Sequence, residues 1–391
     1  MARRRTGPAD PFTPTFGKTP PVLAGRHDEL EAWQYALEMG PGAMGRAALI
    51  TGARGMGKTV MLNEYERIAA REFGWLVISE TATAGMMQRI TRTHLPRILE
   101  RLDPKGERRH LLDVQLPAYL GGGGVKTSVE NRHPVELDAR SQVEAVTELL
   151  QDGPQPGRGL LITVDEVHRN SSEDMRQLTT IIQHAVRENR EVAFVGAGLA
   201  AAVKDLLNDD VVTFLRRASR VMLDAVPDHS VRTALVEPAR DAGVPFEREA
   251  VEAAIGSTRG YPFLLQLVGS QAFRAAVRDG AKSIDVGHVD KAAAEAIAIM
   301  GTHIHEPALS GLSEMDLKYL VAMAVDEQTS GTGEVARRLG VSADYAGQYR
   351  RRLIEAGLIV APARGKVEFA LPFLREHLLD RGAQEDATDE P

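Results

Sequence analysis

Eight residues near the N-terminus constrain the fold of this chain more than any other feature. Residues 52–59 read Gly-Ala-Arg-Gly-Met-Gly-Lys-Thr and match G-x-x-x-x-G-K-[ST], the pattern of a phosphate-binding loop. An apolar run over 47–50 precedes them as a buried strand would, and a helix-forming stretch over 59–71 follows. Glycines let the backbone amides face a phosphate, and the helix directs its N-terminal end at the same charge. The pattern therefore predicts strand, loop and helix around a phosphate group.

We expect this loop to bind ATP. Lys58 would reach the β and γ phosphates, and Thr59 would bind Mg²⁺. The residues predicted to contact the nucleotide here are Gly52, Ala53, Arg54, Gly55, Met56, Gly57, Lys58 and Thr59. An ordinary glycine-rich loop is the alternative, and the flanking strand and helix argue against it.

A second apolar strand, 160–164, ends in two adjacent carboxylates, Asp165 and Glu166. In an open parallel sheet, ligands bind beyond the carboxyl ends of the strands, where the phosphate loop also opens. We expect Asp165 to hold Mg²⁺, directly or through water, and Glu166 to polarise the attacking water. A glutamate directly after the Mg²⁺-binding aspartate favours hydrolysis of ATP over transfer of phosphate to a second substrate.

Two further features bear on the rate of hydrolysis. ATPases of this layout usually place a polar side chain near the γ phosphate after the third strand, but this chain has Gly-Ala-Gly at 196–198. Either backbone amides substitute or hydrolysis is slow. Arg216 and Arg217 are candidates to reach the γ phosphate of a neighbouring subunit, a contact worth ~10³ to 10⁵ in rate. The alternative is a solvated basic helix end. The predicted catalytic set is Glu166, Lys58, Arg216 and Arg217.

The order of predicted elements indicates several units. Strands alternate with helices from about 22 to 225, which predicts an α/β P-loop NTPase core with a parallel sheet. A polar stretch over 103–140, with four glycines at 121–124, is predicted to be an inserted loop or hairpin. Helical periodicity then replaces the strands. The predicted units are a disordered basic tail (1–20), the nucleotide-binding α/β domain (21–226), a helical lid (227–305), a winged helix (306–380) and a disordered acidic tail (381–391).

The composition of the chain limits its compartment and its partners. The chain has 391 residues, no cysteine and a formal net charge of −7. Without cysteine it has neither disulfides nor cysteine-ligated zinc, which fits a reducing compartment. The N-terminus has no apolar segment typical of a signal peptide, and no apolar run approaches the length of a membrane span. We expect a cytoplasmic protein without a membrane partner. The negative charge means that nucleic-acid binding would need a local basic face.

The C-terminal region predicts such a face. Helix, helix, turn, helix and hairpin follow one another from about residue 309, the order of a winged helix-turn-helix. In the third helix, 343–356, Ala346, Tyr349 and Leu353 form a core-facing stripe, which turns other side chains outward. The residues predicted to contact duplex DNA are Tyr345, Gln348, Arg351 and Arg352 on this helix and Arg364 and Lys366 on the hairpin. Charges in this region nearly balance, so a protein-docking module is the alternative.

These features together resemble the AAA+ ATPases of the initiator type, the relatives of the origin recognition complex and the Cdc-type loader subunits, with their archaeal and actinobacterial cousins. The resemblance rests on Val-Leu-Ala-Gly-Arg-His-Asp-Glu-Leu at 22–30, the phosphate loop, the acidic strand, the arginines after Phe214, the lid and the winged helix. It implies that Val22, Leu23 and Arg26 line the base pocket. It also implies duplex DNA as a partner, and a homo-oligomer or partner ATPase that supplies an arginine in trans.

The lid departs from the replication members of that group. They carry a sensor arginine after a glycine, whereas residues 259–263 read Arg-Gly-Tyr-Pro-Phe. A Gly-x-Pro motif is similar to the signal-transduction STAND ATPases, which implies that Pro262 meets the nucleotide and leaves Arg259 as a substitute for the sensor arginine. The leading hypothesis is an ATP-dependent switch with slow hydrolysis that engages DNA. The alternative is a STAND-like regulator whose winged helix binds protein. A metabolic kinase is disfavoured because Glu166 supplies a water activator.

Overall fold

A five-stranded parallel sheet carries the phosphate loop. The computed structural model describes residues 8–15, 17–104, 107–112, 126–131, 138–153, 157–167, 172–208 and 210–388. The sheet order is β2-β5-β6-β1-β7, and every pairing in it is parallel. The strands are β1 (Ala47–Gly52), β2 (Leu76–Thr81), β5 (Leu160–Val167), β6 (Val192–Gly198) and β7 (Ser219–Leu223). The predicted α/β core is confirmed, and β7 is an edge strand that the sequence pattern did not reveal.

Alternation along the strands covers both faces of the sheet. Ile50 and Leu161 pack on one face with α1 (His27–Glu38) and α2 (Lys58–Arg71). Their neighbours Leu49 and Ile162 pack on the other face. The helices on that side are α3 (Met86–Arg89), α4 (Leu95–Leu102), α5 (Ala139–Gln151), α6 (Ser172–Arg187) and α7 (Ala200–Leu207), and a 3₁₀ helix, η3 (Asp210–Arg217), leads into β7. Because successive side chains point to opposite faces, two separate cores form.

Two irregular segments lie between β2 and α5. A π-helical turn, η1 (Ile90–His94), comes directly before α4; Pro96 near the start of α4 has no amide hydrogen for a regular helical bond, which is consistent with a wider turn there. The stretch over 103–140 contains a two-stranded antiparallel hairpin of β3 (Glu107–Leu112) and β4 (Lys126–Asn131). The glycine run at 121–124 lies outside the described residues.

The helical lid follows β7. It consists of α8 (Asp228–Asp241), α9 (Arg248–Thr258), α10 (Pro262–Asp279) and α11 (Val286–Met300). Helix α11 passes without a loop into a π-helical turn, η4 (Gly301–His305), and then into α12 (Glu306–Leu309). The boundary expected between residues 305 and 306 therefore falls inside one helical run, and the lid and the C-terminal unit share one hydrophobic core.

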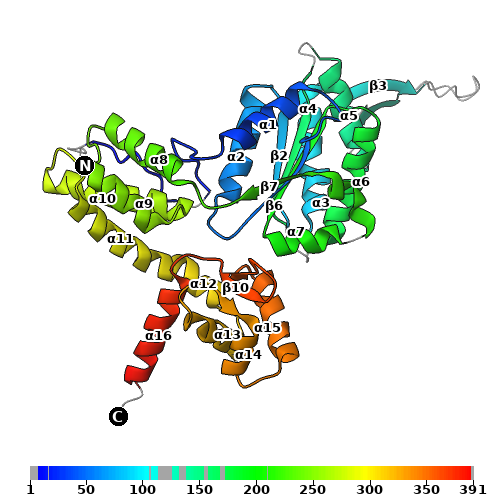
Figure 1. Ribbon diagram of the computed structural model, residues 1–391. Coiled ribbons are helices and arrows are strands. Elements are labelled where there is room, and N and C mark those ends of the chain that lie inside the picture. Colours follow the sequence, from blue (N-terminus) through cyan, green and yellow to red (C-terminus); the bar gives the residue numbers. More distant parts are fainter. Residues whose placement is uncertain are drawn as a thin grey trace, which may run out of the picture.

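The C-terminal unit, residues 306–388, lies below the lid and the sheet in Figure 1. Its elements are α13 (Glu314–Ala324), β8 (Ser330–Gly331), α14 (Thr332–Arg338), α15 (Ala343–Glu355), β9 (Ile359–Val360), β10 (Lys366–Phe369) and α16 (Leu374–Thr388). The three short strands form an antiparallel sheet in the order β8-β10-β9. Within the described residues, no helix is long and apolar enough to cross a membrane.

Parts of both segments that were predicted to be tails have defined structure. Residues 8–15 and 17–20, which we call the N-terminal strap, pack on the lid: Phe12 is buried and meets the ring of Phe273 edge to face at 6.5 Å. The aromatic side chain finds an apolar site there that proline and threonine content did not predict. At the other end, α16 continues to Thr388 and so extends into the acidic segment over 381–391.

Candidate nucleotide-binding site

The phosphate loop has the backbone that its glycines predict. Gly55 and Gly57 take left-handed conformations, with φ of 75° and 85°. A Cβ on Gly52 would lie 2.8 Å from the carbonyl oxygen of Leu223, so only glycine fits beside β7. A Cβ on Gly57 would meet no atom within 4 Å, which leaves open space beside the start of α2. The loop thus opens toward a cavity at the N-terminal end of a 14-residue helix, an arrangement suited to anions.

Lys58 lies across this loop. Its Nζ donates hydrogen bonds to the backbone carbonyls of Gly52 and Ala53, at 3.0 and 2.8 Å. Burial lowers the pKa of Lys58 to about 8, against the opposing effect of the Asp165 carboxylate. The ammonium group is therefore poorly compensated in this site. A bound phosphate would supply the missing negative charge.

The two predicted carboxylates meet the loop at the carboxyl end of β5. Thr59 Oγ1 donates a 2.6 Å hydrogen bond to Asp165 Oδ2, while Asp165 Oδ1 accepts one from the backbone amide of Glu166 at 2.8 Å. A hydroxyl and a carboxylate oxygen are the ligand types that Mg²⁺ takes from proteins of this kind. The chemistry of these donors therefore fits the predicted ion.

Glu166 has an unusual backbone. Its φ is 54°, in the left-handed region, and the pairing of β5 with β6 shifts register between Val164 and Val167. For a residue other than glycine such a conformation costs of order 1–3 kcal/mol. Residues strained in this way are found mainly at functional sites. The bulge turns the exposed Glu166 into the lining of the cavity. Strain is thus stored at the residue predicted to activate water.

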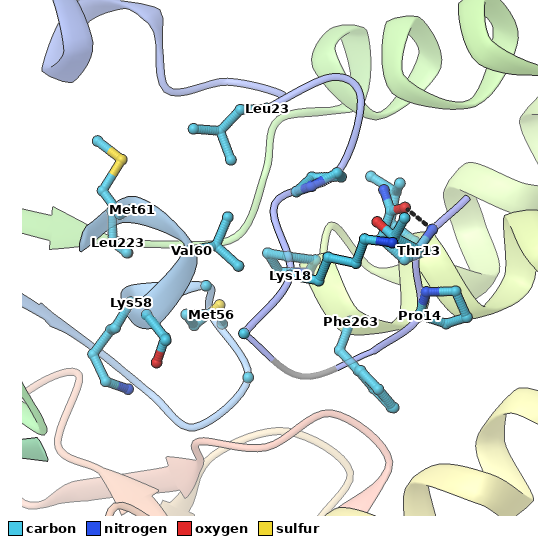
Figure 2. Close-up of a pocket in the computed structure, with 18 of the residues that line it drawn as sticks. Thr13, Pro14, Lys18, Leu23, Met56, Lys58, Val60, Met61, Leu223 and Phe263 are labelled. Atoms are coloured by element: carbon cyan, nitrogen blue, oxygen red, sulfur yellow. Dashed lines mark hydrogen bonds between the residues drawn. The ribbon is translucent and has the colours of Figure 1, made fainter. Parts of the chain in front are cut away.

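A cavity of about 500 Å³ lies between the core and the lid. Figure 2 shows Lys58 and Met56 on one side of it and Phe263 of the lid on the other. Val22, Leu23 and Pro262, which the resemblance placed at the base, all line it, together with Arg26. The Arg26 guanidinium also donates to the backbone carbonyl of Asp224 at 2.5 Å and is buried. Arg26 therefore braces the wall of the cavity against the end of β7.

The N-terminal strap also lines the cavity, and the sequence analysis missed it. Thr13 donates its amide hydrogen to Gln266 of α10, the bond drawn in Figure 2, and Gly17 accepts a hydrogen bond from Asn63 of α2 at 2.7 Å. The strap therefore bridges the lid and the core across the cavity, with Lys18 between. Phe12 among prolines and threonines was the one signal that this segment has a buried anchor.

The π-helical turn η4 supplies another wall that was missed. His303 and Ile304 of this turn line the cavity, together with Pro307 of α12. On the other side of the same turn, His305 is buried and its Nε2 lies 3.0 Å from the backbone carbonyl of Pro372. One helical turn therefore contacts both the cavity and the C-terminal unit.

The absence of a polar side chain at 196–198, the end of β6, has a steric reason. A Cβ on Gly198 would lie 2.6 Å from the carbonyl oxygen of Val167, and one on Gly196 would lie 3.0 Å from the Leu49 side chain. Ala197 is fully buried in the core. Close packing of β6 against β5 and β1 leaves no room at these glycines for a polar side chain that could reach the cavity.

The predicted arginines lie away from the cavity of their own chain. Arg216 Nε donates to the backbone carbonyl of Leu207 at 2.8 Å, and both Arg216 and Arg217 are exposed at the end of η3. Neither is among the described residues that line the cavity. Arg259 also lies elsewhere: it pairs with Glu376 of α16 at 3.2 Å and is not among the described residues that line the cavity.

The residues predicted for DNA differ in their surroundings. Tyr345, Gln348 and Arg351 are exposed on α15, and Arg364 and Lys366 are exposed at the turn between β9 and β10. Ala346 and Leu353 are buried, as the stripe predicted, while Tyr349 is half-buried. Arg352 is held: it pairs with the buried Asp316 at 2.8 Å and lies over the Tyr349 ring.

Comparisons with known proteins agree with this geometry. A family profile described as "AAA ATPase domain" matches residues 22–195. Another, "Domain of unknown function (DUF8462)", matches residues 302–378. No curated protein matches the sequence significantly.

Solved structures extend the likeness to the whole fold. The Aeropyrum pernix ORC2 protein, solved as ADPNP-ADP complexes, is 18% identical, with 96% of this chain and 98% of that chain covered and a TM-score of 0.62. The Thermotoga maritima RuvB Holliday junction branch migration motor is 17% identical over 91% and 95% of the two chains, with a TM-score of 0.44. The Aeropyrum pernix ORC1 protein in complex with DNA is 19% identical over 93% and 94%, with a TM-score of 0.44. Of these three, only the first has a TM-score above 0.5, and it shows that the chain shares the fold of that protein.

Proposed function

We propose that this AAA+ ATPase is a molecular switch that binds ATP with Mg²⁺, hydrolyses it slowly and engages duplex DNA through its C-terminal unit. One observation carries the nucleotide half: Lys58, Thr59, Asp165 and Glu166 converge at one end of a cavity that the lid closes. The likeness of fold to an archaeal protein solved with ADPNP and ADP supports the same ligand class.

Each residue has a definite task in this proposal. The loop amides and Lys58 would hold the β and γ phosphates, and Thr59 with Asp165 would hold Mg²⁺, which neutralises charge on the phosphates. Glu166 would accept a proton from the attacking water. Val22, Leu23 and Pro262 would line the base, with the strap beside them.

Slow turnover follows from what surrounds these residues. Residues 196–198 offer no polar side chain toward the γ phosphate, and neither Arg216 nor Arg217 is among the described residues lining the cavity. A neighbouring subunit that brought Arg216 or Arg217 to the site would raise the rate by ~10³ to 10⁵. Occupancy of the site by ATP or ADP would then matter more than the isolated rate.

Nucleotide binding and turnover test this half. We expect a fluorescent ATP analogue to bind the protein in the presence of Mg²⁺ and Lys58→Ala to weaken binding at least tenfold. The specific ATPase rate should rise with protein concentration if a neighbour completes the site, and Arg217→Ala should abolish that rise. Equal ATP affinity of the wild type and Lys58→Ala would contradict the proposal that this loop binds ATP.

The DNA half rests on α15 and the β9–β10 hairpin. We propose that residues 306–380 are a winged helix in which α15 enters the major groove while Arg364 and Lys366 meet the phosphate backbone. Support comes from the exposure of Tyr345, Gln348 and Arg351 along one helix. Duplex-DNA binding measured over a range of salt, with and without ATP, tests this half.

A contact between the C-terminal unit and the core favours the STAND-like alternative. A Cβ on Gly357, which follows α15, would lie 3.2 Å from the side chain of Leu199, directly after β6. The end of α15 therefore packs against the core, as in a module that docks on protein. Light scattering with ATP and with ADP separates the two: a change in mass with nucleotide and no affinity for DNA would favour the alternative.

A further inference from the structure

The lid touches the phosphate loop through a tyrosine. Tyr261 directly precedes α10, its side chain is 1% exposed, and its hydroxyl donates a hydrogen bond to the backbone carbonyl of Arg54. Burial raises the pKa of the Tyr261 hydroxyl far above its usual range, so the group remains a neutral donor. Because α10 belongs to the lid and Arg54 to the loop after β1, this bond joins two units at the edge of the cavity.

The phosphate loop is shaped to receive this tyrosine. A Cβ on Gly55 would lie 2.0 Å from the Tyr261 hydroxyl oxygen. The pattern G-x-x-x-x-G-K-[ST] leaves this position free, so phosphate binding alone does not require glycine at 55. The close approach of Tyr261, together with the left-handed φ of 75°, does require it. Loop and lid are therefore fitted to each other at this point.

The backbone of Tyr261 is held from the core side as well. Gly260 has φ of 66°, and its carbonyl accepts a 2.8 Å hydrogen bond from the amide of Val226, which lies in the connection between core and lid. A Cβ on Gly260 would lie 2.4 Å from the carbonyl oxygen of Val226. A shift of the tyrosine would therefore strain the connection on which the lid turns.

The preceding residue faces the C-terminal unit. Arg259 has a left-handed backbone, with φ of 48°, and its guanidinium lies 4.0 Å from the ring centroid of Phe373. The same group pairs with Glu376 at the start of α16. Three consecutive residues, 259–261, thus contact the C-terminal unit, the inter-unit connection and the phosphate loop in turn.

From this arrangement we propose that Tyr261 is a positioning residue that transmits nucleotide occupancy from the phosphate loop to the lid, and that Arg259 passes the change on to α16. A nucleotide that rearranges the loop displaces the Arg54 carbonyl, and the hydroxyl bond moves the start of α10 with it. The lid arginine of replication-type relatives would contact the nucleotide directly, whereas Tyr261 contacts the loop backbone. The proposal rests on the proposed nucleotide function and identifies the residues that respond when the site is occupied.

Hydrogen exchange and nucleotide release test the proposal on the full chain. In the wild type, ATP with Mg²⁺ should change the exchange of amides over 262–268 and over 374–378. Tyr261→Phe, which removes only the hydroxyl, should abolish both changes and speed release of a fluorescent ATP analogue roughly 3- to 10-fold, the effect of one hydrogen bond. Arg259→Gln should preserve the change over 262–268 and abolish the one over 374–378.

Tyr65→Phe is the matched control. Tyr65 is equally buried, and its hydroxyl donates to the backbone carbonyl of Glu29 at 3.1 Å, a bond within the core alone. This variant should behave as the wild type does in both measurements. Lys58→Ala separates the proposals, because it should lose nucleotide binding itself.

The possible results are distinct. If the wild type binds no nucleotide, the proposed function falls and this proposal falls with it. If the wild type binds ATP and responds, but Tyr261→Phe gives the same release rate and the same exchange changes as Tyr65→Phe, the coupling through Tyr261 alone is overturned. If Tyr261→Phe loses the response and Arg259→Gln keeps both changes, the step to α16 is overturned.

Discussion

The guanidinium of Arg352 lies 2.8 Å from Oδ2 of Asp316, a carboxylate that is buried under α15. The other oxygen, Oδ1, has no hydrogen-bond partner among the described residues. Two adjacent arginines of α15 therefore have different tasks, although the sequence assigned both to DNA. Arg352 compensates a buried charge, whereas Arg351 is exposed to solvent.

Alanine substitutions should separate these tasks. Arg352→Ala should lower the free energy of unfolding by about 2 kcal/mol, because it leaves Asp316 without its charged partner. Arg351→Ala should change the free energy of unfolding by no more than about 0.5 kcal/mol. It should also lower the steepness of log DNA affinity against log salt concentration by about one, the loss of one phosphate contact. Thermal unfolding and DNA titrations at several salt concentrations measure both. A loss of salt dependence in Arg352→Ala without a loss of stability would contradict the assignment.

The lowered pKa of Lys58 predicts how ATP affinity depends on pH. Phosphate binds the charged ammonium form, so affinity is full below pH 8 and falls as pH rises through the pKa of about 8, by at most about tenfold per pH unit. Binding at about pH 8.5 should take up a proton, because phosphate raises the pKa again. Calorimetry in buffers of different ionisation enthalpy measures the uptake. Heats that are independent of the buffer would show that Lys58 is already charged.

Removal of the Glu166 carboxylate should separate binding from hydrolysis. Glu166→Gln should keep ATP affinity and lower the turnover roughly 10²- to 10⁴-fold, the usual contribution of a general base. Glutamine holds the left-handed backbone no better or worse than glutamate, so the loop should keep its shape. Glu173→Gln, at an exposed glutamate of α6, is the control. Unchanged phosphate release in Glu166→Gln would remove this residue from the chemistry.

Phe12 anchors the strap, and its truncation should release that segment. A Cβ on Gly269 would lie 2.7 Å from the Phe12 ring, which shows how closely the ring fits against α10. Phe12→Ala should cost about 3 kcal/mol of local stability and speed tryptic cleavage after Lys18 about 100-fold. Tyr35→Ala, at an aromatic that is 61% exposed, should not change this rate. Equal cleavage in both variants would mean that the anchor is not needed.

Acid should destabilise the junction between the lid and the C-terminal unit. Burial and then the neighbouring His377 lower the pKa of His305 to about 4, below the ordinary 6.5. The unfolded chain binds this proton more readily, so stability falls as pH drops from 6.5 to about 4, by up to about 3 kcal/mol.

Replacement of the ring tests this acid dependence. His305→Asn should flatten the dependence of unfolding on pH between 6.5 and about 4, while His229→Asn, at an exposed histidine of α8, should leave it intact. A pH dependence that persists in His305→Asn would assign the effect to other groups.

Local patterns predicted the core of the site and failed at its borders. The phosphate loop and the Asp165-Glu166 pair were found because each depends on short-range sequence: glycine spacing, and an apolar strand that ends in carboxylates. The strap and η4 were missed because their role arises from packing between residues far apart in the chain, such as Phe12 against Phe273. No periodicity within either segment encodes that contact.

The edge strand β7 shows a second limit. Its first four residues alternate between half-buried and exposed positions, with Arg220 among them, and only the last, Leu223, is buried, so the strand reads as a basic segment and not as part of a sheet. Pairing with β1 decides their conformation. The ion pair of Arg352 with Asp316 was not foreseen for a related reason: a charged residue on an outward face looks the same in sequence whether or not it pairs with a buried carboxylate.

The cavity also constrains the order of events during synthesis. Its walls come from residues as far apart as Thr13 and Pro307, with the phosphate loop between them. A chain emerging from the ribosome completes the sheet before η4 and α12 exist, so the growing protein has its phosphate loop early but cannot close the site until η4 and α12 have been made. Binding of nucleotide in the closed pocket is therefore a late event in the synthesis of the protein.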